Sequence, residues 1–156
     1  MRSNTSFERT RARSSAQPKR RRARRSAQPL DLMRASVPPK LIEQRIRNRI
    51  YEYVESVAEF PSNRGVWDLN ELVNSWEDYV PDPFQAHLFP APTFSAGEVA
   101  AMAEVHSAWL AFSDATQQDI DDEALAMQTP QWTAFVEVSR LASSTFSIRG
   151  KLEEEE

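Results

Sequence analysis

The residues that could carry out chemistry are few in this chain, and their spacing argues against an active site. There are two histidines, His87 and His106, and no cysteine. His106 falls on the apolar stripe of a predicted helix, where a histidine is most often a core residue hydrogen-bonded to its neighbours. Its acidic neighbours Glu104 and Asp114 would be the partners for proton transfer or for a metal ion. Residues two apart on a helix do not share a face, however, and the helical metal-site spacings His-x-x-x-Glu and His-Glu-x-x-His are absent.

An acidic cluster, Asp119, Asp121, Asp122 and Glu123, could be taken for a cation site. A twelve-residue calcium loop needs alternating oxygen ligands around a central glycine, and no glycine lies near this cluster. The same residues suit the positive N-terminal end of a short helix. A Gly-rich phosphate loop and a Gly-x-Ser-x-Gly motif are also absent. We therefore predict no catalytic residue, no metal site, no cofactor and no enzymatic activity.

The most basic stretch of the chain, residues 19–25, could contact nucleic acid, because Lys and Arg side chains neutralise phosphates and release counterions. No aromatic residue is interleaved with these cations to stack on bases. The stretch belongs to residues 1–37, which hold too few apolar groups to offset the entropy of ordering and are predicted to form a disordered basic leader. A solvated leader without a role of its own is the other interpretation. The candidate nucleic-acid contacts are Lys19, Arg20, Arg21, Arg22, Arg24 and Arg25.

The leader also repeats itself. Eight residues that begin at Arg11, Arg-Ala-Arg-Ser-Ser-Ala-Gln-Pro, recur from Arg22 with seven of the eight positions identical. Asn4-Thr-Ser-Phe-Glu-Arg-Thr-Arg11, followed by Arg24-Arg-Ser-Ala-Gln-Pro-Leu30, resembles the translated recombination sites of bacterial integron gene cassettes. Those sites are imperfect inverted DNA repeats, so their translation would be Arg-rich and self-similar without any selection on the peptide. The resemblance implies a cassette origin and a native start at Met33, which would give the protein a net charge of −12.

The formal net charge of −4 hides two parts of opposite sign. Residues 1–49 hold 15 Lys/Arg against 3 Asp/Glu, a net charge of +12, whereas residues 50–156 hold 4 against 20, a net charge of −16. A small acidic domain can bind a basic partner surface, with electrostatic attraction speeding the encounter and an aromatic anchor supplying affinity. The alternative is that the acidity only keeps a compact domain soluble.

Targeting signals are not evident in the sequence. No window approaches the roughly 18 consecutive apolar residues of a membrane span. The basic start is followed by no apolar region of the kind that a secretory signal contains. The lack of cysteine is compatible with a reducing compartment. We expect a cytoplasmic protein that does not act on membranes.

Apolar spacings of three and four residues predict helices throughout the body of the chain, and no segment shows the sustained two-residue alternation of a strand. The strongest helix signal runs from Ser95 to Phe112, which is apolar on most of its circumference and is therefore predicted to be a core helix covered on several sides. The expected helices are 41–60, 69–79, 96–112, a short one that ends near residue 127, and 130–150.

Several helix starts carry capping signals. Ser95 with Glu98, and Asp68 with Glu71, have the spacing of a capping box. Thr129 precedes a proline at the first helical position. The remaining prediction is that Thr116, with Asp119, caps the short helix.

Two segments of the body bear on recognition. The first helix is predicted to place Arg45, Arg47 and Arg49 on its outer face. The proline-rich segment 81–92 can be neither helix nor central strand, and its aromatic residues indicate a strap over the core. A ligand role for the strap is the less favoured alternative.

The sequence thus predicts an all-α fold. It comprises a domain over residues 38–150, with four main helices and one short helix, behind the leader 1–37 and before an exposed acidic tail, 151–156. The function that we expect is a small acidic, non-enzymatic protein that binds another protein, cassette-encoded and immunity- or antitoxin-like. The alternative function is a nucleic-acid-associated protein that acts through the basic leader.

Overall fold

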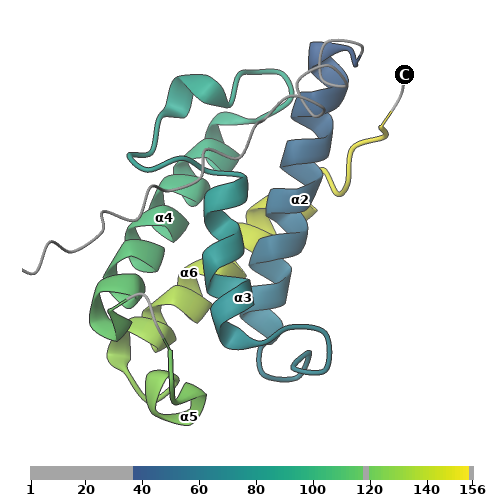
Figure 1. The fold of residues 1–156 in the computed structure, drawn as a ribbon. Coiled ribbons are helices and arrows are strands. Elements are labelled where there is room, and N and C mark those ends of the chain that lie inside the picture. The colour runs from purple at the N-terminus through teal and green to yellow at the C-terminus, as the bar shows by residue number, and fades with distance from the viewer. Residues whose placement is uncertain (1–36, 118–119, 155–156) are drawn as a thin grey trace, which may run out of the picture.

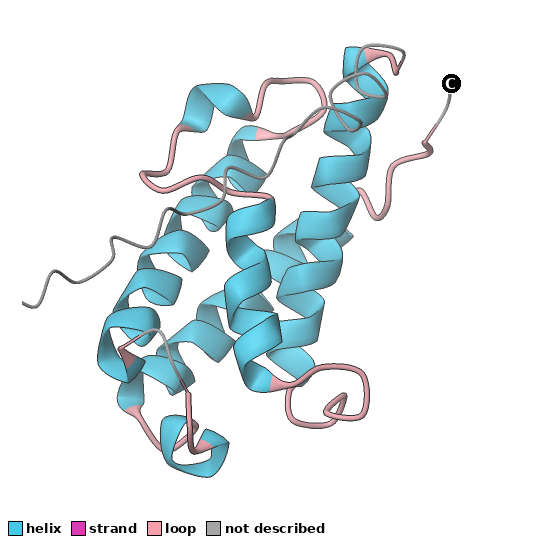
Figure 2. Cartoon of the chain, in the orientation of Figure 1, coloured by secondary structure: helices cyan, strands magenta, loops and turns pink. Residues whose placement is uncertain are grey.

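The computed structural model describes residues 37–117 and 120–154, and all regular elements within them are helical (Figures 1 and 2). The all-α prediction is therefore confirmed for this part of the chain. Residues 1–36 of the leader, with its six candidate cations, and Asp119 lie outside the described residues. The elements are the α-helices α2 (Pro39–Glu59), α3 (Leu69–Asn74), α4 (Ala96–Thr116), α5 (Glu123–Ala126) and α6 (Pro130–Ser147) and the 3-10 helices η1 (Ser75–Asp78) and η2 (Ala86–Leu88).

The body is built from three long helices, in which α6 packs against both α4 and α2. Figure 1 shows α6 behind α2 and α4, and α3 in front of the space between them. This arrangement buries large aromatic side chains from several elements, among them Trp76, Phe112, Phe135 and Phe146, each fully buried. Burial of such rings supplies most of the driving force for a fold of this size. Since α6 contacts both of the other long helices, the packing centres on α6 as much as on α4.

The helix starts follow the predicted caps closely. The Ser95 hydroxyl accepts from the backbone N–H of Glu98 while the Glu98 carboxylate accepts from the Ser95 N–H, which is the expected capping box. Thr129 caps α6, accepting from the N–H of Trp132. Asp68 caps α3 by accepting from the Glu71 N–H at 2.7 Å.

The helix ends differ more from the predictions. Helix α4 continues through Asp114 to Thr116, because the Thr116 hydroxyl is satisfied by donating to the Phe112 carbonyl within the helix, and α4 ends where Gln117 takes a left-handed φ of 54°. Thr116 is therefore not the cap of the short helix. That cap is Asp122, which accepts from the Leu125 N–H. The second helix tightens to 3-10 geometry at Ser75 instead of staying α-helical to residue 79.

Helix α4 is a core helix, as predicted, but its outer side is open to water. Its outer positions are small residues, and Ala96, Ala100, Ala111 and Ala115 are exposed. Alanine is apolar but small and favours the helix intrinsically, so it can face water at little cost. The helix instead buries the opposite side, including Trp109 and Phe112.

The described helices do not have the properties of a membrane span. None of those within residues 37–117 and 120–154 combines the length and the apolar character that crossing a bilayer requires.

Candidate functional site

The predicted outer face of α2 contains the most buried cation of the described chain. Arg47 is fully buried, not exposed, and its guanidinium donates to both carboxylate oxygens of Glu98, at 2.6 and 3.2 Å. Arg149 pairs with the same carboxylate from the other side. Arg45 and Arg49 do face solvent, as predicted. Arg47 turns inward because a second partner, the carbonyl of Gly150 at 2.7 Å, satisfies it as well.

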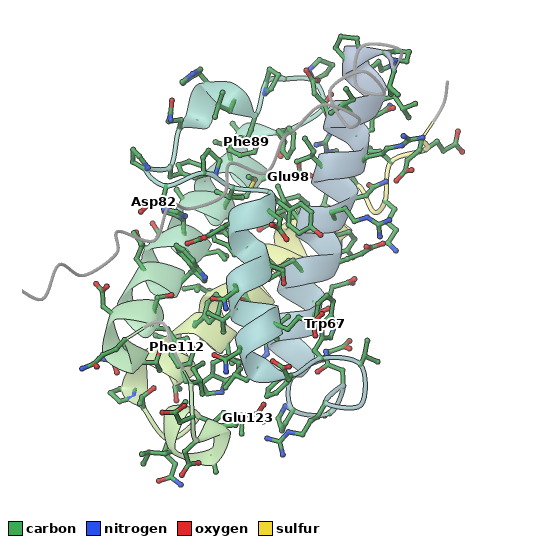
Figure 3. The ribbon with its side chains drawn as sticks, in the orientation of Figure 1. Trp67, Asp82, Phe89, Glu98, Phe112 and Glu123 are labelled. Atoms are coloured by element: carbon green, nitrogen blue, oxygen red, sulfur yellow. The ribbon has the colours of Figure 1, made fainter. Side chains whose placement is uncertain are left out.

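The ion cluster of Arg47, Glu98 and Arg149 is structural. Burial of the Glu98 carboxylate opposes its charge, but hydrogen bonds from Arg47, Arg149 and the Ser95 N–H outweigh that effect and lower the pKa of Glu98 from 4.5 to about 2. The carboxylate is therefore charged at neutral pH and already bonded. Figure 3 labels Glu98 where the first turn of α4 approaches α2. A carboxylate bound on all sides by its own chain is a fold element and not a catalytic base.

The C-terminal segment is attached to α2. The Asn48 amide donates to the Leu152 carbonyl at 2.8 Å and accepts from the Leu152 N–H at 2.9 Å. Lys151 pairs with Glu52, and Glu154 pairs with Arg45. Glu153 and Glu154 are exposed, as predicted, but the segment that carries them is held in place up to residue 154.

His106 is a core histidine, as its position on an apolar stripe predicted. It is buried, and its Nδ1 accepts from the indole N–H of Trp76 at 3.0 Å. An indole can only donate, so the neutral ring carries its proton on Nε2, which faces Asp82 Oδ1 at 3.2 Å. The predicted alternatives, Glu104 and Asp114, are not its partners in the described residues. His106 therefore joins η1 to the strap, whereas His87 is exposed in η2.

The acidic cluster before α5 also serves the fold. Asp122 caps α5, and the Glu123 carboxylate accepts from the Leu69 N–H at 3.0 Å, at the start of α3. Glu123 thus supplies the acceptor for the first N–H of α3, whereas the Glu71 carboxylate does not make the expected bond to the Asp68 N–H in the described residues. Arg64 pairs with Glu123 at 3.3 Å. No group of three or more His, Asp or Glu that could hold a metal occurs in residues 37–117 and 120–154.

A hollow with chemistry that suits recognition lies on the α3–η1 side of the molecule. We call it the Trp67–Tyr79 hollow, and it has a volume of about 450 Å³. Both rings are partly buried and pack against the hydrophobic core, so they are held in place while one side stays accessible. Figure 3 labels Trp67 beside α3. The lining residues are Trp67, Glu71, Asn74, Ser75, Asp78 and Tyr79.

The carboxylates of this hollow have no cation of their own in the described part of the chain. Glu71 and Asp78 are exposed, and neither takes part in any of the ion pairs there. A smaller hollow of about 140 Å³ adjoins it and shares the two rings, but its carboxylate, Glu52, is already bonded to Lys151 and Arg49, which lower its pKa. Negative charge beside accessible aromatic rings is thus unpaired only in the larger hollow.

A second, apolar hollow of about 460 Å³ lies between the strap and α4. It is lined by strap aromatics such as Phe84 and by Ala96 and Ala100, two of the exposed alanines of α4. The predicted strap over the core is partly right, since Phe89 is buried and packs edge-to-face on Phe94, but Leu88 is 47% exposed. The strap also contains η2, a turn of 3-10 helix that the sequence reading excluded. No polar side chain enters this hollow to orient a ligand.

Comparisons with protein-family models, with curated proteins and with solved structures found no match to this chain. Function is therefore inferred from the geometry and the charge of the molecule itself.

Sequence reasoning missed the hollow as a site. In the sequence, Trp67 has the position of a hydrophobic staple before the second helix, and Tyr79 lies at the end of that helix's apolar face. The usable signal was that these aromatics bracket a segment whose exposed positions, apart from Asn74, are acidic: Asp68, Glu71, Glu77 and Asp78. The partial exposure of both rings could not be inferred, because it depends on how α3 packs on α2.

Proposed function

We propose that this protein is a small, non-enzymatic binding protein that recognises a basic segment of another protein. The observation that carries the proposal is the Trp67–Tyr79 hollow, where accessible aromatic rings adjoin the unpaired carboxylates Glu71 and Asp78. Aromatic residues at the centre of an interface typically supply most of its affinity. Every other strong polar cluster described above is bonded within the fold.

Electrostatics supports the same proposal. The net charge of −16 over residues 50–156 attracts a basic partner over long distances and raises its association rate, an effect that salt screens. The acidic residues around α3 and η1 are solvent-exposed, so they can act on an approaching partner. Small immunity- or antitoxin-like proteins, the class that we propose, use this combination of steering and anchoring.

The test is recovery of a partner by the full chain. The bait is a variant in which the six basic residues of segment 19–25 are replaced by Gln, so that the leader cannot attract acidic material. We expect a basic protein to be recovered from host extract and, once purified, to bind the bait more weakly as salt is raised. Recovery of no basic partner, at low salt as well, would count against the proposal.

The basic stretch 19–25 favours a second candidate function, nucleic-acid binding. Six cations within seven residues can neutralise several phosphates, and the affinity should then fall steeply with salt. Fluorescence anisotropy with labelled duplex DNA, comparing the full chain with the six-Gln variant, tests this candidate. Equal binding by the two proteins would exclude a role for the stretch.

The cassette origin and the native start at Met33 remain part of the proposal. Mass spectrometry of the protein's N-terminus in its host would show whether residues 1–32 are translated. Their absence from the native protein would remove the nucleic-acid candidate and leave the acidic body as the only binding surface proposed.

A further inference from the structure

We propose that the Trp67–Tyr79 hollow is an arginine pocket: it binds an arginine side chain of the protein partner, with the guanidinium against an aromatic ring and paired with Glu71 and Asp78. This inference rests on the proposed function and makes it specific. It names the residue that the partner must present and the place where that residue binds.

The two hollows that share Trp67 and Tyr79 differ in whether a cation is already present. In the smaller one, Arg49 pairs with Glu52 at 2.7 Å, so charge there is balanced within the chain. In the larger one, Glu71 and Asp78 provide two negative charges and no lining residue is basic. A cation from outside the described fold therefore belongs in the larger hollow. Its volume of about 450 Å³ is within the range of roughly 300–1,000 Å³ that is usual for ligand sites.

Guanidinium is favoured over ammonium by the combination of groups in the hollow. A planar guanidinium can lie flat on an aromatic ring and still donate in its own plane to carboxylates, whereas an ammonium is a point charge with strong hydration. The Glu71 and Asp78 carboxylates are acceptors only. The side-chain carbonyl of Asn74 adds a neutral acceptor at the same rim.

The same fold uses this combination twice within itself. Arg64 lies over the Phe60 ring, 5.6 Å from its centroid, while pairing with Glu123 at 3.3 Å. Arg47 lies over the Phe146 ring at 5.1 Å while pairing with Glu98. In both places a guanidinium stacks on a ring and bonds a carboxylate. The larger hollow presents rings and carboxylates of the same kind with the guanidinium missing.

Tryptophan fluorescence gives a direct readout of the pocket. The chain has four tryptophans, and Trp76, Trp109 and Trp132 are 0%, 4% and 6% exposed, whereas Trp67 is partly open to solvent. A ligand that stacks in the hollow should therefore change the emission of Trp67 and leave the other three unchanged. Substitution of Trp67 by Leu keeps an apolar side chain at the helix start and removes the ring.

The experiment titrates the full chain carrying the six-Gln leader with three short peptides of identical sequence except for their side-chain type: arginine, lysine or citrulline. We expect the arginine peptide to bind about 2- to 5-fold more tightly than the lysine peptide, a factor equivalent to one exposed cation–π contact, because only the guanidinium can lie flat on the ring and still donate in its own plane. The citrulline peptide, which keeps the shape without the charge, should not bind. Trp67→Leu should abolish the fluorescence change.

Variants that each remove one carboxylate test which charges bind the arginine. Glu71→Gln and Asp78→Asn should each weaken arginine-peptide binding about 2- to 5-fold. Glu77→Gln, which removes the same charge from an exposed position of η1 outside the hollow, should change it less than 2-fold. Thermal melts of all four variants check that the fold is intact. If Trp67→Leu melts early, Glu71→Gln and Asp78→Asn still decide the question.

Three outcomes would overturn the pocket. Equal affinities for the arginine and lysine peptides, or equal effects of Glu77→Gln and Glu71→Gln, would mean diffuse acidic attraction; protein binding would then stand and the pocket would not. If no basic peptide bound, the pocket would also be overturned. The partner-recovery experiment would then test the proposed protein binding separately. Weaker binding by the unmodified chain, with Trp67 emission already shifted, would overturn the partner as the occupant, because the chain's own residues 19–25 would then fill the hollow.

Discussion

The Arg47 guanidinium and the Glu98 carboxylate, 51 residues apart in the chain, form a two-point contact in the interior, with Nη2–Oε1 at 2.6 Å and Nε–Oε2 at 3.2 Å. Glu98 simultaneously closes the capping box at the start of α4 and pairs with Arg149 just beyond the end of α6. One carboxylate thus connects the three long helices. Because Arg47 is fully buried, loss of Glu98 would leave an uncompensated charge in the interior, which is more costly than loss of an exposed pair.

Glu98→Gln is therefore expected to lower the free energy of unfolding by about 3–5 kcal/mol. The substitution keeps the size of the side chain but leaves Arg47 buried without a counter-charge. Urea denaturation followed by circular dichroism measures the loss. Glu104→Gln, at an exposed position of the same helix, is the control and should stay within about 0.5 kcal/mol of the parent. A loss below about 1 kcal/mol for Glu98→Gln would mean that the pair contributes little.

Acid should lower the free energy of unfolding by protonating Glu98. The folded state lowers the pKa of Glu98 from 4.5 to about 2, so its contribution to stability is fully present above pH 4.5 and is lost as the pH falls from 4.5 towards 2. A shift of this size corresponds to up to about 3 kcal/mol. Denaturation midpoints measured across this range should fall more steeply for the parent than for Glu98→Gln. Parallel curves would assign the acid sensitivity to other carboxylates.

The elements of the fold could be predicted because their signals are local. Ser95 and Thr129 cap helices in the structure as their spacing predicted, since a cap depends on residues three apart. The errors lie at helix ends, where neighbouring segments compete. Glu71 was expected to accept from the Asp68 N–H and so complete a capping box, but the described residues lack that bond, and the neighbouring Leu69 N–H donates to Glu123, 54 residues away.

The candidate site could be predicted only in part, because the positions of charged residues in a sequence do not show which of them form ion pairs within the fold. Arg47 and Arg49 are two residues apart on one helix, yet one is fully buried and the other is exposed. Arg47 is buried because it bonds Glu98 and Gly150, and the spacing of residues within one helix does not predict either partner. The unpaired state of Glu71 and Asp78 is likewise visible only after the partners of the other charges are known.

His106→Ala is expected to destabilise the fold by about 1–3 kcal/mol while leaving partner and peptide binding largely intact. Its removal leaves the fully buried indole N–H of Trp76 without an acceptor and detaches Asp82 of the strap. His87→Ala is the matched control, because His87 is exposed and should have almost no effect. Thermal melts measure the folding stability, and arginine-peptide titrations measure the binding. Loss of binding at unchanged stability would point to a functional histidine and contradict the structural role.

Trp109→Ala should cost about 3–5 kcal/mol of folding stability, because it removes a large side chain that is only 4% exposed and leaves a cavity against α3. The indole N–H also donates to the Val73 carbonyl at 2.8 Å. Trp109→Phe separates these two effects, since it retains most of the apolar volume and deletes the donor; we expect a smaller loss, of about 1–2 kcal/mol. Chemical denaturation of both variants makes the comparison. If Trp109→Ala melted close to the parent, the contact between α4 and α3 could not be part of the core.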